Sequence, residues 1–177
     1  MKKLSLRTRV LTGSVAAAAL AAGTFGTVSA NAATPAADAK NKNTMQSTHL
    51  TIEAATKAAQ VTLDAAKKEN QRVSVAVVDR NGNTILTLRG DGAGPQSYEA
   101  AQKKAFTAVS WNAPTSQLVK NLEKAPTLKD IPGTLFLAGG APVTVKNAPI
   151  AGIGVAGAPS GDLDEKFAQA GVASLAK

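Results

Sequence analysis

The pattern that most constrains the fold is a short hairpin signal near the middle of the sequence. Residues 72–79 (R-V-S-V-A-V-V-D) and 84–89 (T-I-L-T-L-R) are short and rich in β-branched side chains, and Asn81-Gly82-Asn83 lies between them. β-Branched residues favour strands, and an Asn-Gly pair between two such segments is typical of a tight hairpin turn. The pattern therefore predicts two antiparallel strands and, with them, a sheet.

Helices and further strands surround this hairpin in the predicted order α-β-β-α-α-β-β-β-α. Apolar spacing and breakers predict helices over 50–70, 97–111, 115–124 and 162–176, and three more strands over 134–138, 143–146 and 150–155. We expect Thr51, Ser97 and Thr115 to cap the first three helices, and Asp162 with Glu165 resembles a capping box that opens the fourth. Strands and helices do not alternate regularly, which disfavours a doubly wound parallel sheet. We therefore expect an α/β fold of the α+β kind, with a central five-stranded, mostly antiparallel sheet flanked by helices. The helices are rich in alanine, which favours close packing on the sheet or on another subunit.

The first 32 residues are typical of a secretory signal peptide. A basic start precedes an Ala-rich apolar stretch over 10–28, and Ala30-Asn31-Ala32 is a small-x-small cleavage site. We expect cleavage after Ala32, with Ala30 as the alternative; a membrane anchor is disfavoured because glycine, serine and threonine interrupt the stretch. Residues 33–48 lack apolar periodicity and predict a disordered tether before one domain over 49–177. The mature protein is thus expected to be secreted and extracellular, either free or associated with the cell wall.

Composition excludes several classes of function. Removing residues 1–32 takes away four of the 20 basic residues and none of the 12 acidic ones, which lowers the net charge from +8 to +4. That charge is too mild to indicate nucleic-acid binding. The absence of cysteine excludes disulfides, thiolate zinc sites, iron–sulfur clusters and cysteine nucleophiles, and a single histidine, His49, excludes multi-histidine metal sites.

Candidate ligands gather on the second predicted helix. Glu99 and Gln102 are i, i+3 neighbours on one helical face, where two carboxylates would make a credible surface iron site; an amide at the second position is a weaker ligand. Lys103 and Lys104 follow, and cations beside an apolar groove suit a flat ligand with carboxylate edges, such as a porphyrin. Taken singly, each residue also has an ordinary interpretation as a helix-dipole partner or a solvated charge.

Four segments carry a resemblance to a known family. They are V-S-V-A-V-V-D-R-N-G-N-T-I-L-T-L-R, S-Y-E-A-A-Q-K-K-A-F-T-A, G-G-A-P-V-T-V and I-A-G-I-G-V-A-G-A-P-S-G-D-L-D-E, with the patterns V-x-D-x-x-G, K-A-x-T-A and G-I-G-V-x-G among them. Together they resemble the GlcG/HbpS-like family over about residues 50–177. A secretory signal on a single such domain is most similar to the secreted, haem-binding branch of that family.

The resemblance implies a profilin-like sandwich, assembly into higher oligomers, commonly octamers, and haem as the cofactor, with an iron ion as a second candidate. It also implies modulation of a membrane sensor histidine kinase in response to haem and redox stress, and in some members slow haem breakdown with release of iron. By position, the haem-ligating threonine of the family falls on Thr134 and the iron-binding pair on Glu99 and Gln102; His49 matches a histidine near the domain start.

Three functions follow as hypotheses. The first is a secreted protein that senses or scavenges haem, with Thr134, Lys103 and Lys104 at the haem. A threonine hydroxyl is a poor iron ligand beside imidazole or thiolate, which predicts weak, exchangeable haem. The second is an enzyme that degrades haem and releases iron, although the sequence shows no acid/base pair for such a reaction. The third is an extracellular adaptor that acts without haem.

Overall fold

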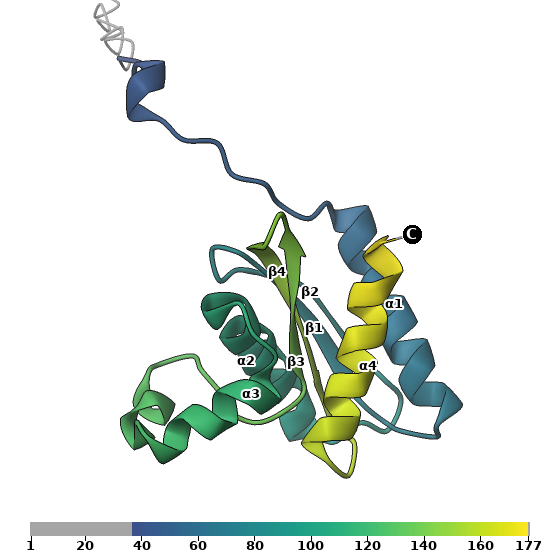
Figure 1. Ribbon diagram of the computed structural model, residues 1–177. Coiled ribbons are helices and arrows are strands. Elements are labelled where there is room, and N and C mark those ends of the chain that lie inside the picture. The colour runs from purple at the N-terminus through teal and green to yellow at the C-terminus, as the bar shows by residue number, and fades with distance from the viewer. Residues whose placement is uncertain (1–36, 177) are drawn as a thin grey trace, which may run out of the picture. The chain divides into compact units, whose positions relative to one another are not determined.

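The computed structural model describes residues 37–176 (Figure 1), so the predicted signal peptide lies outside the described residues. The chain divides into two compact units, Met1–Thr44 and Met45–Lys177. The described part of the first unit contains one short 3₁₀ helix, Asn41–Asn43. Between residues 37 and 176, no helix has the length and apolar character needed to cross a membrane. The second unit, which we call the domain, contains the sheet and the helices around it.

A four-stranded antiparallel sheet forms the centre of this domain, in the strand order β2-β1-β4-β3. The strands are β1 (Ser74–Asp79), β2 (Thr84–Arg89), β3 (Gly140–Val145) and β4 (Ala148–Ala156). Helix α2 (Pro95–Trp111) covers one face, and α1 (Ile52–Lys68) and α4 (Gly161–Ala173) cover the other (Figure 1). Short elements complete the domain: α3 (Thr115–Val119) and the 3₁₀ helices Lys120–Glu123, Pro126–Asp130 and Ser174–Ala176.

Alternation along β1 divides the core into two layers. Val75 and Val77 belong to the apolar cluster under α1 and α4, whereas Ala76 and Val78 belong to the cluster under α2. Successive strand side chains point to opposite faces, so a strand buried on both faces reads as a continuous apolar run. The predicted hairpin is confirmed, and Asp79 closes its turn by accepting hydrogen bonds from the backbone N–H groups of Asn81 (2.8 Å) and Asn83 (2.9 Å).

The prediction of a fifth strand over residues 134–138 is wrong. The backbone turns on itself there: the Thr134 hydroxyl donates to the carbonyl of Ile131, the N–H of Leu137 donates to the carbonyl of Leu135, and Gly139 has a φ of 129°. Phe136 is buried, although the segment pairs with no strand. A short apolar run is compatible with a strand or with a loop that covers a helix, and periodicity cannot separate the two.

Helix caps were predicted with mixed success. Thr51 caps α1 as expected, since its hydroxyl accepts from the N–H of Ala54. Ser97 does not cap α2, which begins two residues earlier at Pro95, because proline is favoured in the first turn where its missing N–H is not needed. Thr115 does not cap α3, and α4 is capped by Ser160 rather than by the predicted box at residues 162–165.

Glycines on the sheet allow α2 to lie directly against it. An added Cβ at Gly152 would overlap the carbonyl oxygen of Ala105, and one at Gly154 would overlap that of Ala101. The facing positions of α2 are themselves alanines, all fully buried. The helix backbone therefore rests on the strand backbone, and this contact fixes the position of every side chain that α2 presents.

Candidate functional site

A hollow lies beside α2 at the hairpin end of the sheet; we call it the Phe106 hollow. Its volume is about 250 Å³, and it is lined by Gln102, Lys103 and Phe106 of α2, by Val78, Gly82 and Thr84 of the hairpin, and by Gly133. Phe106 and the buried Val78 give it an apolar floor, while Gln102 and Lys103 give it a polar rim. Apolar walls with few polar groups at defined positions are typical of ligand sites.

Two glycines leave the ring of Phe106 uncovered. A Cβ at Gly82 would lie 2.7 Å from Cε2 of Phe106, and one at Gly133 would lie 3.6 Å from Cε1. Both glycines have positive φ, 88° and 80°, a conformation that other residues rarely adopt. A larger residue at either position would therefore be strained, and at Gly82 it would also displace the aromatic floor of the hollow.

Lys103 stands at the rim of the hollow in an exposed ion pair. Its Nζ lies 2.6 Å from Oε1 of Glu99, four residues earlier, with 41% of the lysine side chain and 70% of the glutamate side chain exposed. The hydrogen bond and the charge of Lys103 lower the pKa of Glu99. Exposed ion pairs contribute little to stability, so the ammonium can exchange Glu99 for the carboxylate of a ligand at small cost.

Thr134 follows directly after Gly133, which lines the hollow, but Thr134 is not itself among the lining residues. Its hydroxyl donates a hydrogen bond of 2.7 Å to the carbonyl of Ile131. A hydroxyl that has committed its hydrogen in this way still has its oxygen lone pairs, which are the electrons that a metal ligand supplies. The structure thus brings Lys103 and Gly133, the residue before Thr134, to one hollow.

The structure does not gather the other predicted ligands, Glu99, Gln102 and His49, into one metal site. Gln102 lines the hollow, but its amide nitrogen donates to Oγ1 of Thr87 (3.1 Å). Within residues 37–176 no group of three or more His, Cys, Asp or Glu side chains is close enough to hold a metal ion. Nε2 of His49 lies 2.6 Å from the hydroxyl oxygen of Ser47, whereas Glu99 pairs with Lys103. His49 and Glu99 therefore have different partners in the described chain.

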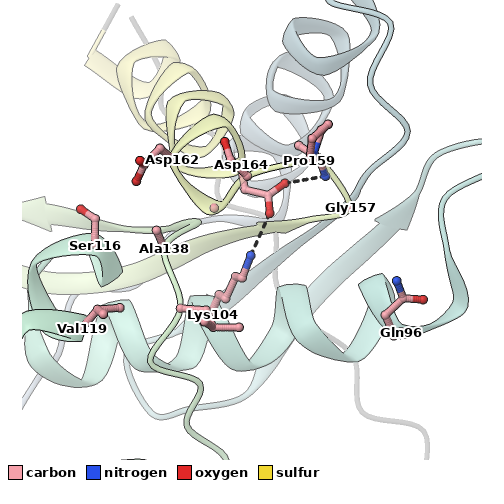
Figure 2. Close-up of a pocket in the computed structure, with 13 residues that line it drawn as sticks. Gln96, Lys104, Ser116, Val119, Ala138, Gly157, Pro159, Asp162 and Asp164 are labelled. Atoms are coloured by element: carbon pink, nitrogen blue, oxygen red, sulfur yellow. Dashed lines mark hydrogen bonds and ion pairs between the residues drawn. The ribbon is translucent and has the colours of Figure 1, made fainter. Parts of the chain in front are cut away.

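Lys104 faces a different space from Lys103, a cavity of about 520 Å³ between α2, α4 and the loop before β3 (Figure 2). Its Nζ lies 2.8 Å from Oδ2 of Asp164 and donates to the carbonyl of Val155 at 3.0 Å. The lysine and aspartate side chains are only 6% and 4% exposed. Adjacent helical residues point about 100° apart, which separates the two lysines. The structure does not bring Lys104 to the Phe106 hollow.

Buried acids of α4 are anchored at this cavity. Burial raises the pKa of Asp164, while Lys104 and the N–H groups of Ala158 and Gly157 act in the opposite direction. The carboxylate of Glu165 accepts from the hydroxyl (2.6 Å) and the N–H (2.9 Å) of Ser116. Every buried polar side-chain atom in the described part of the chain has a hydrogen-bond partner. The cavity therefore holds no orphaned group, and its charges join α2, α3 and α4.

Known proteins share the fold of this chain. A family model described as "Haem degrading protein HbpS-like" matches residues 50–173. The chain belongs to the HbpS-like family. The family resemblance in the sequence is thereby confirmed, as is an α+β fold with an antiparallel sheet between helices, apart from the number of strands.

Three solved structures illustrate the relationship. A double mutant of HbpS from Streptomyces reticuli is 72% identical, with a TM-score of 0.79 over 81% of this chain and 98% of that one. The Klebsiella pneumoniae protein ORFY is 27% identical, with a TM-score of 0.71 over 76% of this chain and 96% of that one. PduOC, crystallised as a haem complex, has a TM-score of 0.66 over 72% of this chain and 95% of that one, and at 24% identity it shows the fold alone.

Several features of this HbpS-like site were not found from the sequence. Nothing in the sequence marks Phe106 as part of a site, and Gly82 is identified there only as a turn residue, although both shape the hollow. Asp164 carries no distinct sequence signal, because the acids at the start of α4 resemble a capping box. For Lys104 the sequence does carry a signal of burial, because this lysine lies among alanines on a helix. A buried lysine needs an acidic partner, but the sequence does not say which acid supplies it.

Proposed function

We propose that this HbpS-like protein binds haem at the Phe106 hollow, with Thr134 as the iron ligand and Lys103 paired with a propionate. The observation that carries the proposal is that Lys103 and Gly133, the residue before Thr134, line one hollow with an aromatic floor. Family membership and a haem complex on the same fold support it. The bound haem would supply the iron and its redox chemistry, as cofactors do.

The chain's own residues determine how firmly haem is held. Thr134 offers oxygen lone pairs while Ile131 holds its hydrogen, which makes a weaker ligand than imidazole or thiolate. Phe106 offers an apolar ring face, and Lys103 a cation that can leave Glu99. Such a site binds haem exchangeably, which suits a protein that senses or scavenges haem rather than one that transfers electrons.

Replacing Thr134 by alanine is expected to weaken haem binding about tenfold, which corresponds to about 1.4 kcal/mol. The substitution removes the ligating oxygen but leaves the apolar floor and Lys103. The measurement is a titration of the purified domain with haemin, followed by the shift of the Soret band.

Thr144→Ala is the matched control, because Thr144 is an exposed threonine of β3 outside the hollow. It should bind haemin like the wild type. Equal affinity of the wild type and Thr134→Ala, with the same spectrum, would reject Thr134 as the ligand. No Soret shift for the wild type at micromolar haemin would reject haem binding itself.

Export of the protein is part of the proposal. The basic start, the Ala-rich stretch and Ala30-Asn31-Ala32 support removal of residues 1–32. Expression of the full chain in a secreting bacterium should therefore yield culture-medium or cell-wall protein that begins at residue 33, or at 31 for the alternative site. Intact mass measurement distinguishes the two. Protein retained in the cell at full mass would contradict export.

We also propose that the protein assembles into an octamer and that haem alters its binding to the extracellular domain of a sensor histidine kinase. Exposed apolar side chains, among them Tyr98, Leu137 and Val145, support association with other chains. Light scattering gives the oligomer size. Binding to the kinase domain that is the same with and without haem would favour the haem-independent adaptor instead.

Haem degradation is the second candidate function, because the matching family model carries that description. Among the residues that line the Phe106 hollow, Lys103 is the one titratable group, and both Lys103 and its partner Glu99 are partly or largely exposed. Such groups are poorly placed as a tuned acid and base, so any breakdown would depend on the haem itself. Bleaching of bound haem by peroxide no faster than that of free haem would exclude an enzymatic contribution.

A further inference from the structure

Thr107 joins α2 to the segment that carries Thr134. Its side chain is fully buried, and its Oγ1 accepts a hydrogen bond of 2.8 Å from the backbone N–H of Leu135, the residue after Thr134. The same hydroxyl donates its hydrogen to the carbonyl of Lys103 at 2.7 Å. The donated hydrogen fixes the rotamer of the hydroxyl, and the fixed lone pair then holds Leu135.

This hydrogen bond matters because strand pairing does not hold the segment in place. Residues 134–138 pair with no strand of the sheet. Of the hydrogen bonds found in residues 37–176, the one between Leu135 and Thr107 connects the 131–138 stretch to α2. The other anchor is apolar: the ring of Phe136 meets the edge of Trp111 at 5.2 Å between centroids. The aromatic contact holds the segment near the helix, whereas the hydrogen bond defines its register.

We propose that Thr107 is the positioning residue of the haem site, an inference that rests on the proposed function. It does not touch the hollow, whose α2 residues are Gln102, Lys103 and Phe106. It acts through its two hydrogen bonds, one to the turn of α2 that carries Lys103 and one to the residue after Thr134. A weak ligand depends strongly on being held in place before the haem arrives, since otherwise binding must also order the segment.

Thr107→Val tests this role, because valine has nearly the shape of threonine but neither donates nor accepts. Haemin affinity should fall about tenfold, the factor that corresponds to the loss of one net hydrogen bond, and the Soret spectrum should shift toward that of Thr134→Ala. Thr107→Ser keeps the hydroxyl and should restore both the affinity and the spectrum. If Thr107→Val folds poorly, Thr107→Ser and Thr107→Ala, compared by the same titration, provide the test.

Thr62→Val is the matched control. Thr62 is also a fully buried helical threonine whose hydroxyl donates to the carbonyl four residues earlier, at 2.8 Å, but it lies on α1 under α4. It should bind haemin like the wild type. If Thr62→Val and Thr107→Val lost the same haemin affinity, the loss would come from a less stable domain rather than from the position of Thr134. That result would overturn the proposal.

The double variant Thr107→Val, Thr134→Ala separates this inference from the proposed function. If Thr107 acts through Thr134, adding Thr107→Val to Thr134→Ala should cause no further loss of affinity. A full additional loss would overturn the positioning role. If Thr107→Val binds haemin like the wild type while Thr134→Ala binds it more weakly, the positioning role is overturned and the proposed haem ligand stands. If Thr134→Ala binds haemin like the wild type, both the proposed ligand and the positioning role are overturned.

Discussion

Gly154→Ala is expected to destabilise the protein by about 3 kcal/mol or more, a large fraction of the stability of a domain of this size. The added Cβ would meet the backbone of α2 at Ala101 and Ala105, whose own side chains are fully buried. Backbone atoms cannot rotate away as a side chain can, so α2 would have to move off the sheet. Urea unfolding followed by circular dichroism measures the loss.

Gly94→Ala is the control for this prediction. Gly94 precedes α2 with an ordinary φ of −59°, and an added Cβ would meet only the flexible end of Gln96. A loss of about 0.5 to 1 kcal/mol is expected, because alanine is a poorer N-cap residue than glycine. If Gly154→Ala and Gly94→Ala had the same midpoint of urea unfolding, the backbone contact between α2 and β4 would be contradicted.

The glycines of β4 also show how far the sequence predicted the fold. The sequence predicts the hairpin and β4 because local patterns alone determine them. These patterns are runs of β-branched residues and turn signals, and the strands that they predict form in the folded protein. The same patterns do not say that Gly152 and Gly154 face a helix, since that depends on which residues α2 brings from far along the chain. Tertiary contact also decided residues 134–138, where anchoring to α2 replaced strand pairing.

The sequence predicts those site residues that lie on a single helix, α2. Lys103 and Gln102 were identified from spacing on α2, and both line the Phe106 hollow. Thr134 was placed through the family resemblance, and its role stays a prediction. Spacing along α2 could not show that Lys104 turns away, because the partner that draws it inward, Asp164, is 60 residues later in the chain.

Lys104→Met is expected to destabilise the protein by about 3 to 5 kcal/mol near neutral pH, the usual result of removing one partner of a buried ion pair. Methionine fills the space of the lysine stem but leaves the carboxylate of Asp164 buried without its cation. Asp164 keeps the N–H of Ala158 at 3.0 Å, a neutral donor that compensates only part of the lost charge. Urea unfolding at several pH values measures both the loss and its pH dependence.

The pH dependence of this variant has a defined sign. Burial already raises the pKa of Asp164 above its ordinary value of 3.8, and removing the ammonium of Lys104, which lowers that pKa, raises it further. Between 3.8 and the raised pKa, the folded state binds a proton that the unfolded state does not. The contribution of Asp164 to the stability of Lys104→Met should therefore grow as the pH falls through this window and decline as the pH rises.

Adding Asp164→Asn to Lys104→Met removes the buried charge and keeps an oxygen that can accept from Ala158. The double variant should recover much of the lost stability at neutral pH and lose the pH window, since asparagine does not titrate there. Recovery would mean that the cost of Lys104→Met lies in an uncompensated charge rather than in lost packing. A double variant as unstable as Lys104→Met at every pH would show instead that the lysine stem and its bond to Val155 hold α2 to the sheet, and that Asp164 contributes little.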